Sequence, residues 1–223
     1  MSIKNQILNI FFPPKCPFCG KLLTATEKTV CEKCKTSLPY RPEGKIKEKH
    51  NGFDCAVTFY YEDMVKDGIR ALKFHRIPTR AAAFAPYLAQ TAAEYFGGEF
   101  DAITFVPISR WRNFSRGFDQ SQLLAQETAK LWDAKAEKIL VKVRNNPPQS
   151  SVKTSAQRRS NVLGAYGVRR GAQIRGRRFL LIDDVLTTGS TLSECAEILL
   201  QAGAQSVVCL ALAGGHRSSK AIE

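Results

Sequence analysis

Residues 178–192 constrain the fold of this chain more than any other stretch. They begin with an apolar run at 179–182, which is typical of a strand buried in a parallel sheet. Two adjacent carboxylates, Asp183 and Asp184, follow this run. After a short polar loop, apolar residues recur at helical spacing until Gly203, a residue type that commonly ends helices. The sequence therefore predicts an α/β fold in which a polar loop joins a buried strand to a helix.

The polar loop consists of Thr187, Thr188, Gly189, Ser190 and Thr191. It lies at the amino end of the predicted helix, where backbone N–H groups and the helix dipole attract anions. Glycine lets the backbone approach a ligand closely. The two preceding carboxylates suit ribose hydroxyls, as in dinucleotide sites. A ligand with a phosphate and a vicinal diol would satisfy both halves of the site. The alternative is an ordinary polar turn, although two buried aspartates without a ligand would be costly.

This arrangement resembles the phosphoribosyl pyrophosphate loop of type I phosphoribosyltransferases. The resemblance implies an open parallel sheet with helices on both faces. It also implies that Asp183 and Asp184 hold the ribose hydroxyls, and that residues 187–191 hold the 5′-phosphate. The implied reaction breaks the bond between ribose C1 and pyrophosphate through an oxocarbenium-like centre, with Mg²⁺ bridging the pyrophosphate and ribose oxygens.

Basic residues before this loop are candidates to neutralise the pyrophosphate. Arg110 and Arg116 follow a predicted strand at 101–106 and therefore belong at the carboxyl end of the sheet. Of the two, we take Arg116 as catalytic, together with Asp183 and Asp184. Lys73 ends a predicted helix at 64–74. Arginines interleaved with aromatic residues also suit a nucleic-acid patch, and a solvated basic loop is a further alternative. A solvated position at the end of its helix is an equal alternative for Lys73.

Two Cys-x-x-Cys pairs near the amino terminus predict a metal site. The pairs are Cys16 with Cys19 and Cys31 with Cys34. Each pair directs two thiolates to one centre, so that four sulfurs complete a tetrahedral zinc site. Four protein ligands leave no position for water, which indicates a structural zinc. Disulfides or unligated thiols are the alternatives.

Composition indicates a globular chain with anionic partners. Hydrophobic residues make up 44% of the 223 residues, and the formal net charge is +13. We expect a zinc-ribbon module over residues 1–44 and the α/β domain over 45–223, with a polar linker at 38–50. No apolar run approaches the roughly 18 residues that a membrane span needs. We therefore expect a cytoplasmic protein.

The remaining elements follow from periodicity and turn signals. Asp119 is a predicted helix N-cap, with Gln122 at the capping-box position. A long polar loop at 144–154 is a predicted lid over the site. Strands are predicted at 53–61, 137–143 (the second parallel strand), 165–168 and 206–213, and helices at 80–96, 122–132 and 155–162.

The four cysteines, the stretch 116–120 and the loop at 183–191 occur in the order found in the ComF family, which the whole chain resembles. Its members are described as competence or DNA-uptake proteins, or as amidophosphoribosyltransferase-like. The family motif has Asn where this chain has Asp119. The resemblance also implies ligand roles for Gln149, Arg158 and Asn161.

Two functions of different classes follow. The first is a Mg²⁺-dependent glycosyltransferase of the phosphoribosyltransferase type, which acts on an acceptor that the sequence does not identify. The second is a non-catalytic protein that binds nucleotides or single-stranded DNA and supports DNA uptake together with other uptake proteins. Only about ten residues follow the last predicted strand, so we expect acceptor recognition to come from the amino-terminal region.

Overall fold

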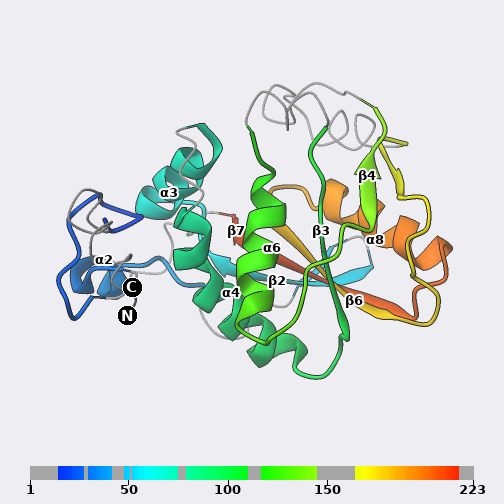
Figure 1. Ribbon diagram of the computed structural model, residues 1–223, viewed down its shortest axis with the longest axis horizontal. Helices are drawn as coiled ribbons and strands as arrows, with labels where there is room; N and C mark the ends of the chain where they lie inside the picture. Colours follow the sequence, from blue (N-terminus) through cyan, green and yellow to red (C-terminus); the bar gives the residue numbers. More distant parts are fainter. Residues whose placement is uncertain are drawn as a thin grey trace, which may run out of the picture.

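The computed structural model describes residues 15–27, 30–41, 48–50, 52–74, 79–109, 117–144 and 164–215, with the backbone alone at 48–50, 73–74 and 79. Its centre is a five-stranded sheet in the order β1-β2-β7-β6-β3 (Figure 1). The strands are β1 (Glu48–His50), β2 (Phe53–Phe59), β3 (Ala102–Phe105), β6 (Arg178–Leu186) and β7 (Ser206–Gly214). β2, β7, β6 and β3 run parallel, whereas β1 pairs antiparallel with β2.

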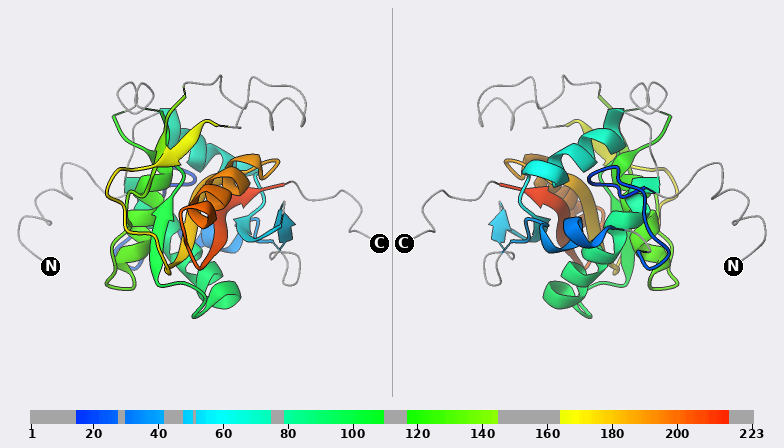
Figure 2. Two further views of the ribbon diagram at one scale, coloured as in Figure 1. Left: turned by 90° about the vertical axis from the view of Figure 1, so that its right-hand side faces the viewer. Right: turned by 90° about the vertical axis from the view of Figure 1, so that its left-hand side faces the viewer.

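Both faces of the sheet are buried, as its continuous apolar strands require. Leu180 and Ile182 of β6 belong to one apolar core, and Phe179 and Leu181 belong to the other. The first core contains residues of helices α3 (Asp63–Phe74), α4 (Thr79–Phe96) and α6 (Gln120–Lys130). The second contains residues of α8 (Ser190–Gln201). Figures 1 and 2 show α4 and α6 on one side of the sheet and α8 on the other.

Most predicted elements are confirmed to within about two residues. The strands near 53–61, 101–106 and 206–213 and the helices near 64–74, 80–96 and 122–132 are all present. Gly203 follows the end of α8 with φ of 97°, and its N–H donates to the carbonyl of Leu200 at 2.9 Å. The N–H of Ala204 donates to the carbonyl of Leu199 at 3.0 Å, which completes a Schellman motif. The helix predicted at 155–162 lies outside the described residues.

The prediction of a second parallel strand at 137–143 is wrong. In the part of this region that the structure describes, the parallel pairing with β3 is a single bridge between Ile103 and Ala136, the residue just before the predicted strand. Strand β4 (Leu140–Lys142) instead pairs antiparallel with β5 (Tyr166–Val168) in a separate two-stranded sheet. This small sheet packs towards α8, where Glu194 Oε1 accepts a hydrogen bond of 3.0 Å from the N–H of Ala165. Val143 is 60% exposed, and such exposure does not suit a strand buried on both faces.

The predicted linker at 38–50 is also largely wrong. Leu38 and Pro39 are buried, and the carbonyl of Pro39 accepts a hydrogen bond of 2.9 Å from the N–H of Tyr60. Tyr40 bridges antiparallel to Phe59 at the end of β2, and β1 pairs with the beginning of the same strand. Two parts of this segment therefore extend the edge of the sheet. The predicted boundary between residues 44 and 45 lies outside the described residues.

No helix within the described ranges combines the length and the apolar character that crossing a membrane requires.

Candidate functional site

The carboxylate pair lies at the end of the central strand β6, and its two members have different surroundings. Asp183 is only 9% exposed, whereas Asp184 is half-buried. Oδ1 of Asp183 accepts a hydrogen bond of 2.9 Å from Ser121 Oγ, at the start of α6. The same oxygen accepts one of 2.8 Å from the N–H of Asp184. The first carboxylate is therefore held in one orientation, and the second is the more accessible of the two.

The polar loop after β6 turns directly into helix α8. Gly189 is the N-cap and has φ of 73°, in the left-handed region that favours glycine. Thr187 is exposed, and Thr188 and Thr191 are half-buried. The hydroxyls of Thr188 and Ser190 lie 2.9 Å apart and form a hydrogen bond. The loop thus combines accessible hydroxyls with a helix amino end, whose first N–H groups have no acceptor within the helix.

Asp119 ties the start of α6 to the loop that follows β3, and its predicted role as N-cap is confirmed. Its Oδ1 accepts a hydrogen bond of 3.2 Å from the N–H of Gln122. Its Oδ2 accepts one of 2.8 Å from the N–H of Ile108. An aspartate offers two oxygens to these two donors, whereas the asparagine of the family motif offers one.

The carboxyl of Asp119 also has an unusual affinity for protons. Burial raises its pKa to about 6, against the hydrogen bonds from Ile108 and Gln122, which lower it. The negative charge of Asp184 raises this pKa further, and Lys138 acts in the opposite direction. The charge at the end of β6 therefore contributes to the raised pKa of the carboxyl that caps α6.

Several predicted ligands lie outside the described residues. These are Arg110 and Arg116, as well as Gln149, Arg158 and Asn161. The predicted lid at 144–154 falls there too, except for Arg144. Lys73 lies in α3, but its side chain is not described. The contribution of Ser121 to the site was not predicted, because a serine in the first turn of a helix carries no sequence signal of its partner.

The four predicted zinc ligands come together near the amino terminus. All four sulfurs of Cys16, Cys19, Cys31 and Cys34 lie within 4.8 Å of one another. The sulfurs of Cys19 and Cys31 are 3.7 Å apart. Tetrahedral sulfurs at about 2.3 Å from a zinc ion lie about 3.8 Å from one another, so this set fits zinc. Gly20 after the first pair has φ of 76°, as the predicted tight turn needs.

The cysteine cluster is part of the main core rather than an isolated module. Cys16, Cys31 and Cys34 are each at most 2% exposed and pack in the same apolar core as α4. The ring of Phe18 meets that of Phe84 of α4 edge to face, with centroids 5.2 Å apart. Loss of the metal would therefore disturb the packing of α4 as well as the cysteine loops.

Two protein-family models match this chain. A phosphoribosyl transferase domain matches residues 118–223, which include α6, the carboxylate pair and the loop. A double zinc ribbon domain matches residues 7–46. Four cysteines fall in the second range, enough for one zinc site. Cys55, Cys195 and Cys209 are buried in the core beneath α8. The fold is thus an open parallel phosphoribosyltransferase-type sheet with an amino-terminal zinc ribbon.

Similar proteins carry names that refer to DNA utilization or to competence. The DNA utilization protein YhgH of Escherichia coli (strain K12) is 32% identical over 205 residues, 86% of each chain. The competence protein ComFC of Bacillus subtilis (strain 168) is 26% identical over 188 residues, which are 84% of this chain and 72% of that protein. Competence protein F of Haemophilus influenzae is 31% identical over 115 residues, about half of each chain.

Among solved structures, the glutamine phosphoribosylpyrophosphate amidotransferase of B. subtilis, complexed with ADP and GMP, aligns with a TM-score of 0.41 and 24% identity. The alignment covers 59% of this chain and 26% of that enzyme. A hypoxanthine phosphoribosyltransferase from Staphylococcus aureus aligns with a TM-score of 0.39 and 15% identity, over 64% of this chain and 68% of that one.

Proposed function

The chain belongs to the ComF family, and we propose that it binds phosphoribosyl pyrophosphate at the 183–191 loop and transfers the phosphoribosyl group to a nitrogen acceptor. One observation carries this proposal above the others. A fixed and a more accessible carboxylate are consecutive residues near the end of a central parallel strand, and a polar loop then leads into a glycine-capped helix. Carboxylates accept hydrogen bonds from ribose hydroxyls, and the amino end of a helix binds phosphate, so the two parts suit the two halves of the ligand.

The two carboxylates would hold the ribose hydroxyls. Asp183 supports this role through its orientation, because Ser121 and the N–H of Asp184 both donate to its Oδ1. Asp184 is less buried and is the residue that we expect to lose most ligand contact on substitution. The hydroxyls and N–H groups of residues 187–191 would surround the 5′-phosphate.

Transfer requires the bond from ribose C1 to pyrophosphate to break, with positive charge developing on the ring. Catalysis of such a step depends on positioning and on stabilising the leaving group more than on a strong base. Arg110, Arg116 and Lys73 remain the residues that we predict to neutralise the pyrophosphate. The carboxylate pair, with Asp183 held in one orientation, would hold the ribose while the C1 substituent changes.

The donors at this site suit Mg²⁺, which prefers oxygen ligands and keeps several of its waters. The carboxylate of Asp184 and the hydroxyls of Thr187 and Thr188 are oxygen donors that are at least partly accessible. Bound together with the pyrophosphate, Mg²⁺ would offset the negative charge of the leaving group.

The names of the relatives lead us to place this activity in the uptake or use of DNA. Single-stranded DNA and DNA-uptake proteins are the partners that we propose on this basis, together with a net charge of +13. The carboxylate pair and the polar loop together suit phosphoribosyl pyrophosphate, so we favour the enzyme over the non-catalytic binding protein.

Release of pyrophosphate from phosphoribosyl pyrophosphate tests the proposal. The zinc-loaded full chain would be incubated with Mg²⁺ and a panel of ammonia, amines and nucleobases. We expect acceptor-dependent release that disappears in the Asp184→Asn variant. Release at the same rate from the variant, or none with any acceptor, would contradict the proposed transfer. Calorimetric titration of phosphoribosyl pyrophosphate tests binding separately from transfer.

A further inference from the structure

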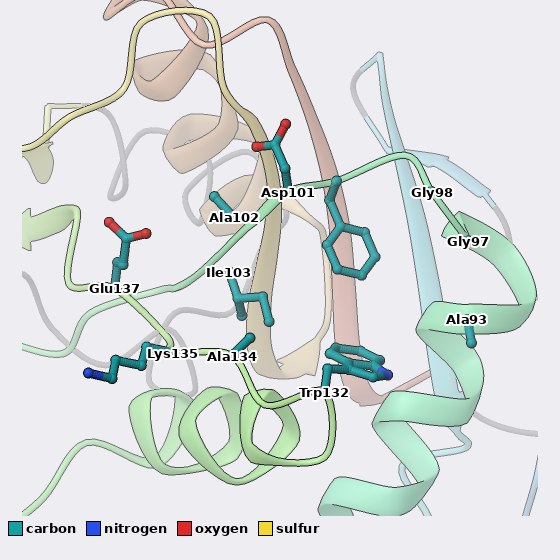
Figure 3. A pocket seen from close by; sticks show the side chains of 11 residues that line it. Ala93, Gly97, Gly98, Asp101, Ala102, Ile103, Trp132, Ala134, Lys135 and Glu137 are labelled. Carbon is teal, nitrogen blue, oxygen red and sulfur yellow. The ribbon is translucent and has the colours of Figure 1, made fainter.

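A cavity lies at the opposite end of β3 from the loops of the proposed phosphoribosyl site. It has a volume of about 440 Å³, within the range of roughly 300–1,000 Å³ that is usual for small-molecule sites. Its walls come from the end of α4, the start of β3 and the segment after α6, as Figure 3 shows. None of the residues of the carboxylate pair or of the polar loop lines it.

Arg177, just before β6, and Arg178, its first residue, connect the walls of this cavity. Arg178 donates from Nε to Asp101 Oδ2 at 3.1 Å and from Nη1 to the carbonyl of Gly98 at 2.7 Å. Arg177 forms a two-point ion pair with Glu137. The N–H of Glu137 in turn donates to the carbonyl of Ile103 at 2.8 Å. The three walls are thus joined by hydrogen bonds before any ligand arrives, which reduces the entropy cost of binding.

The interior of the cavity is apolar and aromatic. Figure 3 shows the indole of Trp132 beside Ile103 and Ala134, with the charged ends of Asp101, Glu137 and Lys135 towards the periphery. The rings of Phe100 and Trp132 pack against each other at a centroid distance of 5.7 Å and an angle of 52°. These rings offer a planar ligand an aromatic wall against which it can stack or pack edge to face.

The charges around the cavity favour an anion over a cation. Both carboxylates of the lining already have an arginine partner. Burial acts to raise the pKa of Asp101, but its hydrogen bonds with Arg178 outweigh this and keep the pKa low, so the carboxylate stays paired. Lys135, in contrast, has no ion pair within the part of the chain that the structure describes.

We propose that this cavity binds a planar aromatic anion, whose ring packs against Trp132 and Phe100 while its acidic group meets Lys135. Two sources share this chemistry, namely aromatic carboxylates and nucleoside monophosphates. The site is separate from the phosphoribosyl site and does not depend on its activity.

Fluorine NMR of the full chain labelled with 5-fluorotryptophan tests the proposal. The sequence contains two tryptophans, and a Trp132→Phe variant assigns their resonances. Indole-3-acetate and UMP serve as the two anionic probes, with indole-3-acetamide and uridine as their neutral counterparts. We expect a saturable shift of the Trp132 resonance, with at least one anion binding about threefold or more tightly than its neutral counterpart. A single partly exposed charge contact corresponds to a factor of this size. Whichever anion binds more tightly identifies the source.

Variants locate the binding. Ala93→Leu places a larger side chain at the wall of the cavity and should weaken the response at least about tenfold. Gln90→Leu, an exposed position on the same helix that does not line the cavity, should not. Lys135→Ala should remove the preference for anions, and Asp184→Asn should leave the Trp132 response unchanged. No shift with either anion would overturn the proposal, as would a shift that survives in Ala93→Leu or disappears in Asp184→Asn.

Discussion

Ser121 Oγ donates a hydrogen bond of 2.9 Å to Asp183 Oδ1 across 62 positions of sequence, which joins the first turn of α6 to the end of the central strand. Both residues are buried, at 3% and 9% exposure. A buried carboxylate needs such donors, because an uncompensated charge in the interior is strongly unfavourable. Together with the N–H of Asp184, Ser121 determines the orientation of the Asp183 carboxylate in the proposed ribose-binding site.

Replacing Ser121 with Ala should therefore weaken the binding of phosphoribosyl pyrophosphate about tenfold without unfolding the protein. A hydrogen bond to a charged group is worth about 1.5–3 kcal/mol, and alanine is compatible with the helix. Thr128→Val on the same helix is the control, because the buried hydroxyl of Thr128 has no hydrogen-bond partner among the described residues. Calorimetry on both variants checks the prediction, and equal affinities would show that Ser121 does not position Asp183.

Gly189→Ala should weaken the binding of phosphoribosyl pyrophosphate in addition to lowering the stability of the fold. Gly189 has φ of 73° at the cap of α8, where any other residue costs about 1–2 kcal/mol. Gly203→Ala at the other end of the same helix, with φ of 97°, carries a comparable backbone cost. Thermal unfolding should show similar losses in the two variants. Only the first should lose affinity for phosphoribosyl pyrophosphate, and a matching loss in Gly203→Ala would argue against a ligand at the loop.

The raised pKa of Asp119 predicts a specific pH dependence of stability. The folded pKa of about 6 exceeds the ordinary value of 3.8, so the folded protein binds this proton more tightly than the unfolded chain does. The resulting stability is present at low pH and is lost as the pH rises from about 4 through 6. The loss amounts to about 3 kcal/mol, at 1.36 kcal/mol for each pH unit of difference.

Urea unfolding of the protein and of Asp119→Asn between pH 4 and pH 7 measures this contribution. The stability of the original protein relative to the variant should decrease over this range and level off above pH 7. Asparagine cannot titrate, and therefore other groups cancel in the comparison. A constant difference across the range would mean that Asp119 titrates near its ordinary value.

Zinc removal should destabilise the whole chain rather than the amino-terminal loops alone. Cys16, Cys31 and Cys34 share their apolar core with Phe84 and Leu88 of α4. We expect one zinc ion per chain by elemental analysis, and a single unfolding transition that moves to lower temperature with a chelator. Cys31→Ser should reproduce this shift, while Cys209→Ala should retain its zinc. Two zinc ions per chain would be incompatible with this account, as would a main unfolding transition whose temperature does not change when the chelator is added.

Local patterns predicted the elements that carry the site. The apolar run before Asp183 correctly predicted a buried parallel strand. The spacing of the two Cys-x-x-Cys pairs correctly predicted the cluster of Cys16, Cys19, Cys31 and Cys34. Gly203 correctly marked the end of α8 because a left-handed residue is required there. Each of these features depends on neighbours in sequence, and short-range geometry is sufficient to specify it.

Pairings between distant segments were not predictable in the same way. The apolar content of residues 137–143 suits any strand, and only the tertiary structure shows that β4 pairs with β5 instead of joining the main sheet. The polar composition of residues 38–50 predicted a linker, although two parts of this segment pair with β2. Strands at the edge of a sheet are often polar, so composition did not reveal these pairings. The contact between Ser121 and Asp183 likewise follows from how α6 packs on the sheet.

Calorimetric titration of phosphoribosyl pyrophosphate with Mg²⁺ into the zinc-loaded chain and into Asp184→Asn tests the central claim most directly. We predict saturable binding at one site per chain by the original protein. We also predict no measurable binding by the variant, with its unfolding temperature close to that of the original protein. Equal affinity in the two proteins, or no binding by either, would contradict a binding site for the ribose and phosphate groups at the end of β6.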